Sequence, residues 1–235
     1  MQKLLLLNIL REAWKYCNQN PKAMGLFVGL NYVVCAAAAW SWKSFWFWPV
    51  LIMMYVLWSA LFRYYFERKP YVEIYSLFNS MIPSTKILVL SVLVVSAILL
   101  LPVGVLFIPN LPMEFLNIYS RFLNQAMHES DIMDSIVNLV VIIFSPFILY
   151  RPMLAWIAAL LGRSGSLKFA WEKTKGNYWE FLLLAIIIDL SLAALYNGIL
   201  ALGGNVIVAL LPISVLVVYF NVALAKVYEF FFLDI

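Results

Sequence analysis

Long apolar stretches alternate with short polar segments along the chain. A helix needs about 17–25 predominantly apolar residues to cross a bilayer. Six stretches meet this requirement: residues 24–42, 45–62, 87–108, 134–161, 181–202 and 206–225. The pattern predicts an all-α polytopic membrane protein, with six transmembrane helices in a single domain over residues 1–235. The first stretch is expected to serve as its own insertion signal, since polar residues interrupt the apolar N-terminus too early for a cleaved one.

The segments between these stretches predict further elements. Residues 1–23 and 163–180 mix polar and apolar positions before a pair of spans, and each is expected to form an interfacial helix. Within residues 109–133, apolar positions recur at helical spacing with charges between them, which predicts an amphipathic segment on the other face of the membrane. Gly203-Gly204-Asn205 predicts a tight turn between the last two spans.

Composition supports a membrane protein. Hydrophobic residues make up 65% of the chain and charged residues only 12%, whereas soluble domains average about 45–50% and about 25%. These values exclude an ordinary soluble enzyme, a disordered chain and a disulfide scaffold. The two cysteines, Cys17 and Cys35, are expected to be free thiols. The expected partners are membrane lipids and either other membrane proteins or further copies of the chain, with no nucleic acid.

Basic residues lie almost entirely on one side of the predicted spans, which orients the chain. On that side are Lys3, Arg11, Lys15, Lys22, Arg63, Arg68, Lys69, Lys86, Arg151, Arg163, Lys168, Lys173, Lys175 and Lys226. The other side carries Lys43 and Arg121. The rule that basic loops stay in the cytoplasm predicts that both termini are cytoplasmic, and the localisation expected is a bacterial inner membrane.

Tryptophans lie near both predicted membrane surfaces. Trp40, Trp42, Trp46 and Trp48 lie at the outer end of the first two spans, and Trp14, Trp171 and Trp179 lie at the inner side. Interfacial anchoring explains this placement, and an aromatic cage for a ligand is the alternative.

A weak internal repeat relates the two predicted interfacial helices. Ala13-Trp14 is followed by Asn20, and Ala170-Trp171 is followed by Asn177 at the same spacing. Residues 72–78 also precede a span, without the tryptophan. The pattern indicates three copies of one unit, an interfacial helix followed by two spans, as occurs in other membrane folds.

Residues 167–179, which read LKFAWEKTKGNYW, carry a more specific pattern. They resemble a signature of a bacterial superfamily that includes YciC-like inner-membrane proteins and the membrane domain fused to some glycerophosphodiester phosphodiesterases. The matching positions are Trp171, Thr174, Lys175, Gly176 and Asn177. The resemblance implies six spans, cytoplasmic interfacial helices and an arginine within the fourth span. It implies no particular activity, and no phosphodiesterase domain is expected within residues 1–235.

Two ionisable residues within predicted spans are functional candidates because charges are costly there. Asp189 lies ten residues above Trp179, which is about 15 Å along a helix. Arg151 lies at a similar depth if the fourth span continues to residue 161, and the two then form an ion pair inside the bundle. In the alternative, the span ends at Tyr150, and Pro152 begins an interfacial helix. Asp189 is then protonated or hydrogen-bonded to Asn31, Asn197 or a tyrosine.

Prolines and asparagines within the spans are further candidates. Pro102, Pro146 and Pro212 each remove a helix hydrogen bond and predict kinks, which serve either gating or static shape. Asn31, Asn138, Asn197 and Asn221 are expected to hydrogen-bond between helices.

Candidate catalytic chemistry is sparse. His128 lies beside Glu129 and Asp131, but helical spacing places them on different faces, so no metal or cofactor is expected. No nucleophile, phosphate-binding or zinc-protease motif occurs. The sequence therefore predicts a non-enzymatic scaffold, accessory or envelope-maintenance protein. A carrier or lipid-handling protein that uses Asp189 and Arg151 is the alternative.

Overall fold

A computed structural model describes residues 5–41, 47–67, 85–86, 89–90, 93, 150–163 and 167–233 of the chain. Within these ranges the chain forms seven helices and no strand. The helices are α1 (Leu6–Gln19), α2 (Pro21–Ser41), α3 (Phe47–Glu67), α7 (Arg151–Leu160), α8 (Leu167–Lys173), α9 (Tyr178–Ala201) and α10 (Val206–Phe232). The expected all-α class is therefore confirmed for the described residues.

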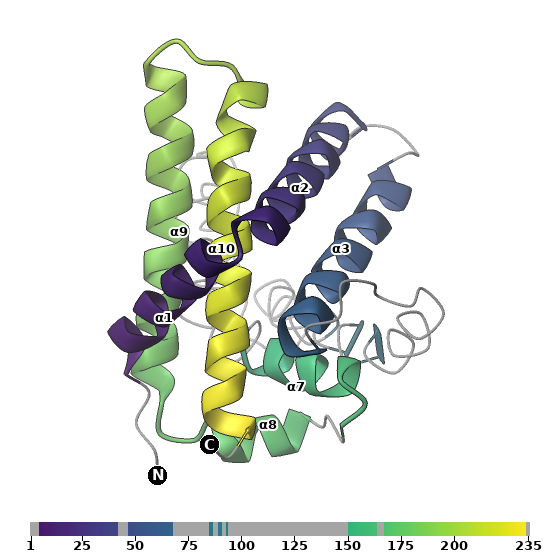
Figure 1. Ribbon diagram of the computed structural model, residues 1–235, viewed down its shortest axis with the longest axis vertical. Coiled ribbons are helices and arrows are strands. Elements are labelled where there is room, and N and C mark those ends of the chain that lie inside the picture. Colours follow the sequence, from purple (N-terminus) through teal and green to yellow (C-terminus); the bar gives the residue numbers. More distant parts are fainter. Residues whose placement is uncertain are drawn as a thin grey trace, which may run out of the picture.

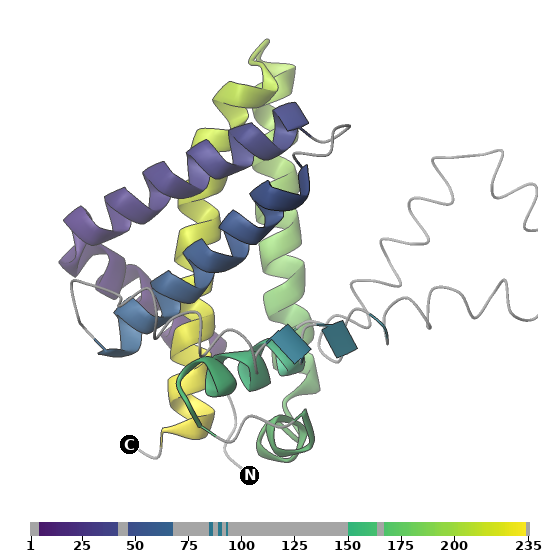
Figure 2. The same cartoon turned by 90° about the vertical axis from the view of Figure 1, so that its right-hand side faces the viewer.

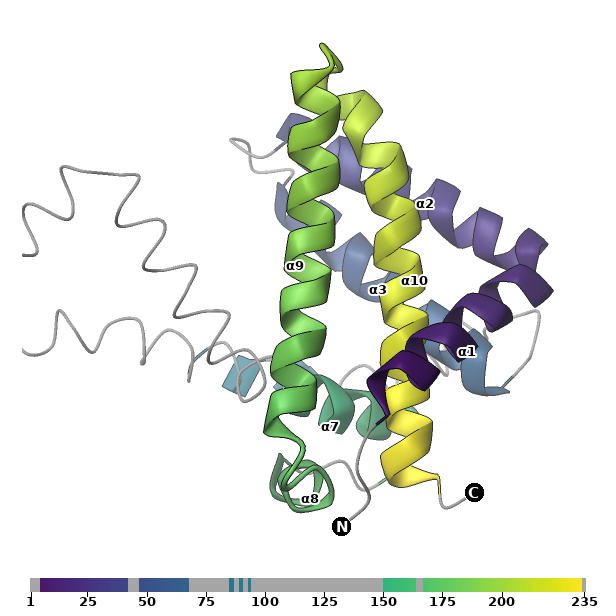
Figure 3. The ribbon, with the colours of Figure 1, turned by 90° about the vertical axis from the view of Figure 1, so that its left-hand side faces the viewer.

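Helix α10 is the centre of the bundle and contacts α1, α2, α3, α7 and α9. Helices α9 and α10 stand side by side and antiparallel, while α2 and α3 form a tilted hairpin beside them (Figures 1 and 2). Helix α1 crosses α10, and α8 lies below the start of α9 (Figure 3). The C-terminal end of α10 lies at the end of the bundle that holds α7 and α8, which we call the base (Figure 1).

Among the described residues, three helices are long and apolar enough to cross a membrane: residues 21–40 of α2, all of α9 and all of α10. Most of the α9 residues are not buried within the bundle, and its exposed and half-buried side chains are largely leucine, isoleucine and alanine. Exposing such an apolar surface to water would be unfavourable, whereas lipid acyl chains solvate it. The chain is a membrane protein with these helices as candidate spans.

Four predicted spans correspond to described helices. The ranges 24–42, 45–62, 181–202 and 206–225 overlap α2, α3, α9 and α10 respectively. Most of the ranges 87–108 and 134–161 lies outside the described residues, as do the segment 109–133, Pro102 and Pro146.

The predicted turn between the last two spans is confirmed, and its residues explain its geometry. Gly203 adopts a φ of 80°, a left-handed conformation that glycine tolerates best. The N–H groups of Gly203 and Gly204 donate to the carbonyls of Leu200 and Ile199, which closes α9 with a Schellman motif. Asn205 then caps α10 by accepting a 2.9 Å hydrogen bond from the Val208 N–H.

The tightest packing lies towards the base. Trp156 of α7 is almost fully buried and stacks edge-on against Phe62 of α3, with ring centroids 5.4 Å apart. Its indole N–H donates a 2.9 Å hydrogen bond to the Tyr55 hydroxyl. On α1, Leu6, Ile9 and Ala13 form a buried stripe at helical spacing. The base is therefore a well-packed layer that holds the short helices against the long ones.

Candidate functional site

Arg151 and Asp189 lie in different environments. Arg151 is 4% exposed at the start of α7, which lies across the base (Figure 1). Asp189 is exposed, about 15 Å up α9 from Trp179. The expected ion pair between these two residues is not found in the described part of the chain. The alternative, in which Pro152 stands in the first turn of a short helix, accounts for the geometry, because α7 keeps Arg151 at the base.

Arg151 instead contacts the motif at residues 167–179. Its guanidinium carbon lies 4.0 Å from the centre of the Trp171 ring, which is a cation–π contact. Its Nη2 donates a 3.5 Å hydrogen bond to the Thr174 carbonyl. These contacts hold α7 against the end of α8. They also offset part of the free-energy cost of burying the charged guanidinium.

The motif residues shape the turn from α8 into α9. The Thr174 side chain is fully buried, and its hydroxyl donates a 2.8 Å hydrogen bond to the Ala170 carbonyl. Gly176 has a φ of 87° and lies in the turn after α8, which the hydrogen bond from the Asn177 N–H to the Thr174 carbonyl closes. Asn177 is 2% exposed and stands at the N-cap position of α9, while the Lys175 side chain is exposed. Backbone and packing requirements thus account for most of the motif.

The other candidates within spans take separate places. Asn31 is 1% exposed and accepts a 3.4 Å hydrogen bond from the indole N–H of Trp58, which joins α2 to α3. Asn197 is exposed on α9. Pro212 lies inside α10, and the nearby Ser214 hydroxyl donates a 2.8 Å hydrogen bond to the Leu210 carbonyl. The structure does not gather these residues into one site.

A cluster of charged residues joins three helices at the base, and the sequence did not predict it. The Lys226 ammonium lies 2.7 Å from Glu229 and 3.9 Å from Glu12 of α1. The Tyr65 hydroxyl of α3 donates a 2.9 Å hydrogen bond to the same oxygen, Oε2, of Glu229. We call Glu12, Tyr65, Lys226 and Glu229 the base cluster. The spacing of Lys226 and Glu229 along α10 was its only sequence signal.

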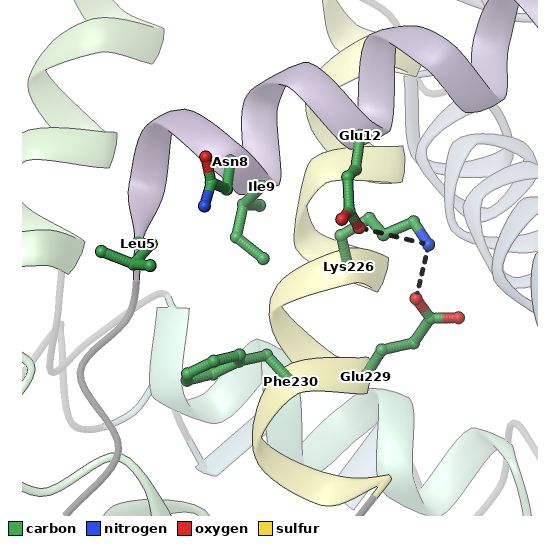
Figure 4. Close-up of a pocket in the computed structure, with 7 residues that line it drawn as sticks. All are labelled: Leu5, Asn8, Ile9, Glu12, Lys226, Glu229 and Phe230. Atoms are coloured by element: carbon green, nitrogen blue, oxygen red, sulfur yellow. Dashed lines mark hydrogen bonds and ion pairs between the residues drawn. The ribbon is translucent and has the colours of Figure 1, made fainter. Parts of the chain in front are cut away.

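A groove between α1 and α10 borders this cluster (Figure 4). It has an ionic end, formed by Glu12, Lys226 and Glu229, and an apolar end, formed by Leu5, Ile9 and Phe230, with Asn8 above. Its volume is about 220 Å³. We call it the α1–α10 groove.

Within the described ranges, no group of three or more histidine, cysteine, aspartate or glutamate side chains is placed to hold a metal ion. His128, Glu129 and Asp131 lie outside those ranges. Cys17 and Cys35 are free thiols, as expected. Burial raises the pKa of Cys17 to about 11, which lowers the reactivity of its thiol.

The chain matches no protein-family model, and neither a curated protein nor a solved structure matches it.

Proposed function

We propose that the chain is a bacterial inner-membrane protein with six spans and both termini in the cytoplasm. The strong bias of lysine and arginine towards one side supports this orientation. The α9–α10 hairpin supports it too, because it starts and ends at the base, and α3 also ends there, beside α7, while α2 begins partway up α10 (Figure 1). An even number of spans is then required between the termini.

We further propose the three-unit repeat and the YciC-like relationship. The two copies of the short motif play similar structural roles. Ala13 and Ala170 are both fully buried, and the carbonyls of Asn20 and Asn177 accept hydrogen bonds from the N–H groups of Met24 and Phe181. In each copy the asparagine therefore begins the next long helix. The relationship itself rests on residues 167–179 alone.

The function we propose is a non-enzymatic scaffold or accessory role at the cytoplasmic face. The main observation that supports this role is the packed base, in which α1, α7 and α8 pack against the long helices. Exposed basic side chains cover this layer: Arg11, Lys15, Lys22, Arg163, Lys168, Lys173 and Lys175. Exposed tryptophans accompany them: Trp14, Trp171 and Trp179. A rigid surface rich in arginine, lysine and tryptophan suits both anionic headgroups and an acidic protein partner.

Site-specific photocrosslinking in cells tests this role. A photoreactive phenylalanine analogue replaces Trp14 or Lys175, which are exposed at the base, or Leu190, which is exposed halfway along α9 as a control. A scaffold predicts one protein adduct of defined mass from the base positions that the control lacks, and an adduct of twice the chain mass identifies a homo-oligomer. Lipid adducts alone at all three positions would contradict the scaffold role.

Lipid handling is the second candidate function, and the α1–α10 groove favours it. The groove combines ionic and apolar ends as a phospholipid does, and it lies beside the amphipathic α1. This candidate no longer depends on an Arg151–Asp189 pair.

A further inference from the structure

The α1–α10 groove lies at the depth of lipid headgroups in the proposed orientation. Lys226 follows Val206, at the far end of α10, by twenty residues, which is about 30 Å of helix. The hydrocarbon core of a bilayer is about 30 Å thick. With Val206 near one surface, Lys226 lies near the other, where the headgroups begin. The molecules most abundant around the groove are therefore phospholipids.

The size of the groove suits part of a lipid. Pockets for drug-sized ligands measure about 300–1,000 Å³, and this groove measures about 220 Å³. It has room for a small polar headgroup, while the acyl chains of the same lipid extend out of the groove. Leu5 and Phe230 border the apolar end, and Leu5 is 63% exposed, so this end is accessible to acyl chains (Figure 4).

The charges in the groove favour a cation. Lys226 and the Tyr65 hydroxyl both contact the same oxygen of Glu229, so the negative charge of the Glu229 carboxylate is balanced by these two groups. Glu12 is only 3.9 Å from Lys226, and its side chain is 62% exposed. Among the residues that line the groove, two carboxylates thus share one ammonium, and the excess negative charge lies on Glu12 at the opening of the groove. An anionic headgroup is repelled there, whereas an ammonium is attracted.

We propose that the α1–α10 groove binds the headgroup of a zwitterionic phospholipid with a primary ammonium, such as phosphatidylethanolamine. Glu12 accepts hydrogen bonds from the ammonium. Asn8, one helical turn away on the same face of α1, donates from its amide to the phosphate. The apolar end contacts the glycerol and the first methylene groups. A choline headgroup has no N–H to donate, so the groove distinguishes the two zwitterions.

The experiment measures lipid binding to the purified full chain in detergent by native mass spectrometry. Phosphatidylethanolamine, phosphatidylcholine and phosphatidylglycerol with identical acyl chains are titrated separately. The wild-type chain is expected to bind the ethanolamine lipid at least about fivefold more tightly than the other two. Glu12→Gln is expected to weaken ethanolamine-lipid binding about tenfold and abolish the preference, because the charge-assisted hydrogen bond from the ammonium becomes a weaker one to a neutral acceptor.

Matched variants make the result specific. Glu172→Gln removes an exposed carboxylate from α8, away from the groove, and is expected to leave binding unchanged. Asn8→Ala is expected to weaken ethanolamine-lipid binding several-fold. Thermal melting without lipid establishes that each variant is folded. If Glu12→Gln does not fold, Asn8→Ala decides, since unchanged binding in that variant refutes the site.

Three results would overturn the proposal. The first is equal binding of the ethanolamine and choline lipids by the wild-type chain, and the second is a preference that survives in Glu12→Gln. The third is competition by soluble phosphoethanolamine as effective as the intact lipid, which would indicate a cytoplasmic ligand. The inference requires that α10 spans a bilayer and rests on the lipid-handling candidate, and it stands or fails separately from the scaffold role.

Discussion

The hydrogen bond from Tyr65 to Glu229 connects α3 to α10, and a double-mutant cycle measures its strength. Tyr65 is 5% exposed, and its hydroxyl lies 2.9 Å from the Glu229 carboxylate. Hydrogen bonds to charged groups contribute about 1.5–3 kcal/mol. Because the Glu229 side chain is 22% exposed, solvent screening favours the lower end, so Tyr65→Phe is expected to cost about 1.5 kcal/mol of unfolding free energy.

Glu229→Gln also weakens the 2.7 Å contact with Lys226. Breaking a buried ion pair costs about 3–5 kcal/mol, and partial exposure of both side chains reduces this to about 2 kcal/mol. The double variant is expected to be about 1 kcal/mol more stable than the sum of the two single effects predicts, since the shared hydrogen bond is lost only once.

Unfolding by sodium dodecyl sulfate in mixed dodecylmaltoside micelles, followed by tryptophan fluorescence, gives these free energies. Tyr64→Phe is the matched control, since Tyr64 neighbours Tyr65 on α3 but lies outside the base cluster, and it is expected to cost less than about 0.5 kcal/mol. Effects of Tyr65→Phe and Glu229→Gln that add within about 0.3–0.5 kcal/mol would show no interaction and refute the base cluster.

Three further variants test other parts of the structure. Gly176→Ala places a side chain at a φ of 87° and is expected to cost about 1–2 kcal/mol of unfolding free energy in the same assay. Gly176→Asn is expected to cost less, because asparagine tolerates the left-handed conformation better. If the two variants were equally stable, the left-handed turn would be contradicted. Arg151→Lys is expected to cost about 1 kcal/mol because an ammonium cannot stack flat on Trp171, and no change would count against the cation–π contact. In a Cys35→Ser background, Cys17 is expected to be alkylated about 100-fold more slowly at pH 8 than an ordinary thiol. Its rate should rise about tenfold per pH unit until the pH approaches 11, whereas a plateau near pH 9 would contradict its burial.

The long helices were predictable because their apolar runs are long enough to span a bilayer. Residues 181–202 were predicted and α9 covers Tyr178–Ala201. The apolar run of the last span stops near residue 225, yet α10 continues to Phe232. The helix continues because Lys226 and Glu229 find partners on α1 and α3. Such partners are set by tertiary packing, which the local pattern does not contain.

The candidate site was less predictable for the same reason. Tyr65 and Glu229 are far apart in the sequence, and neither lies in a recognisable motif. For Arg151 the depth argument assumed a straight fourth span, while Pro152 is compatible with either a continued or a newly started helix. The resemblance of the Trp171–Asn177 motif to a family signature stays a prediction, and its buried Thr174 and left-handed Gly176 indicate a turn-forming role that spacing alone did not reveal.

The proposed membrane topology is tested most directly by labelling single cysteines with a membrane-impermeant maleimide in intact spheroplasts. The background is Cys17→Ser/Cys35→Ser, and the positions are Leu202→Cys in the α9–α10 turn, Lys175→Cys at the base and His128→Cys in the segment 109–133. Leu202→Cys and His128→Cys are expected to react in intact cells, and Lys175→Cys only after permeabilisation. Labelling of Lys175→Cys in intact cells, or protection of Leu202→Cys, would contradict the orientation, and protection of His128→Cys would contradict the six spans.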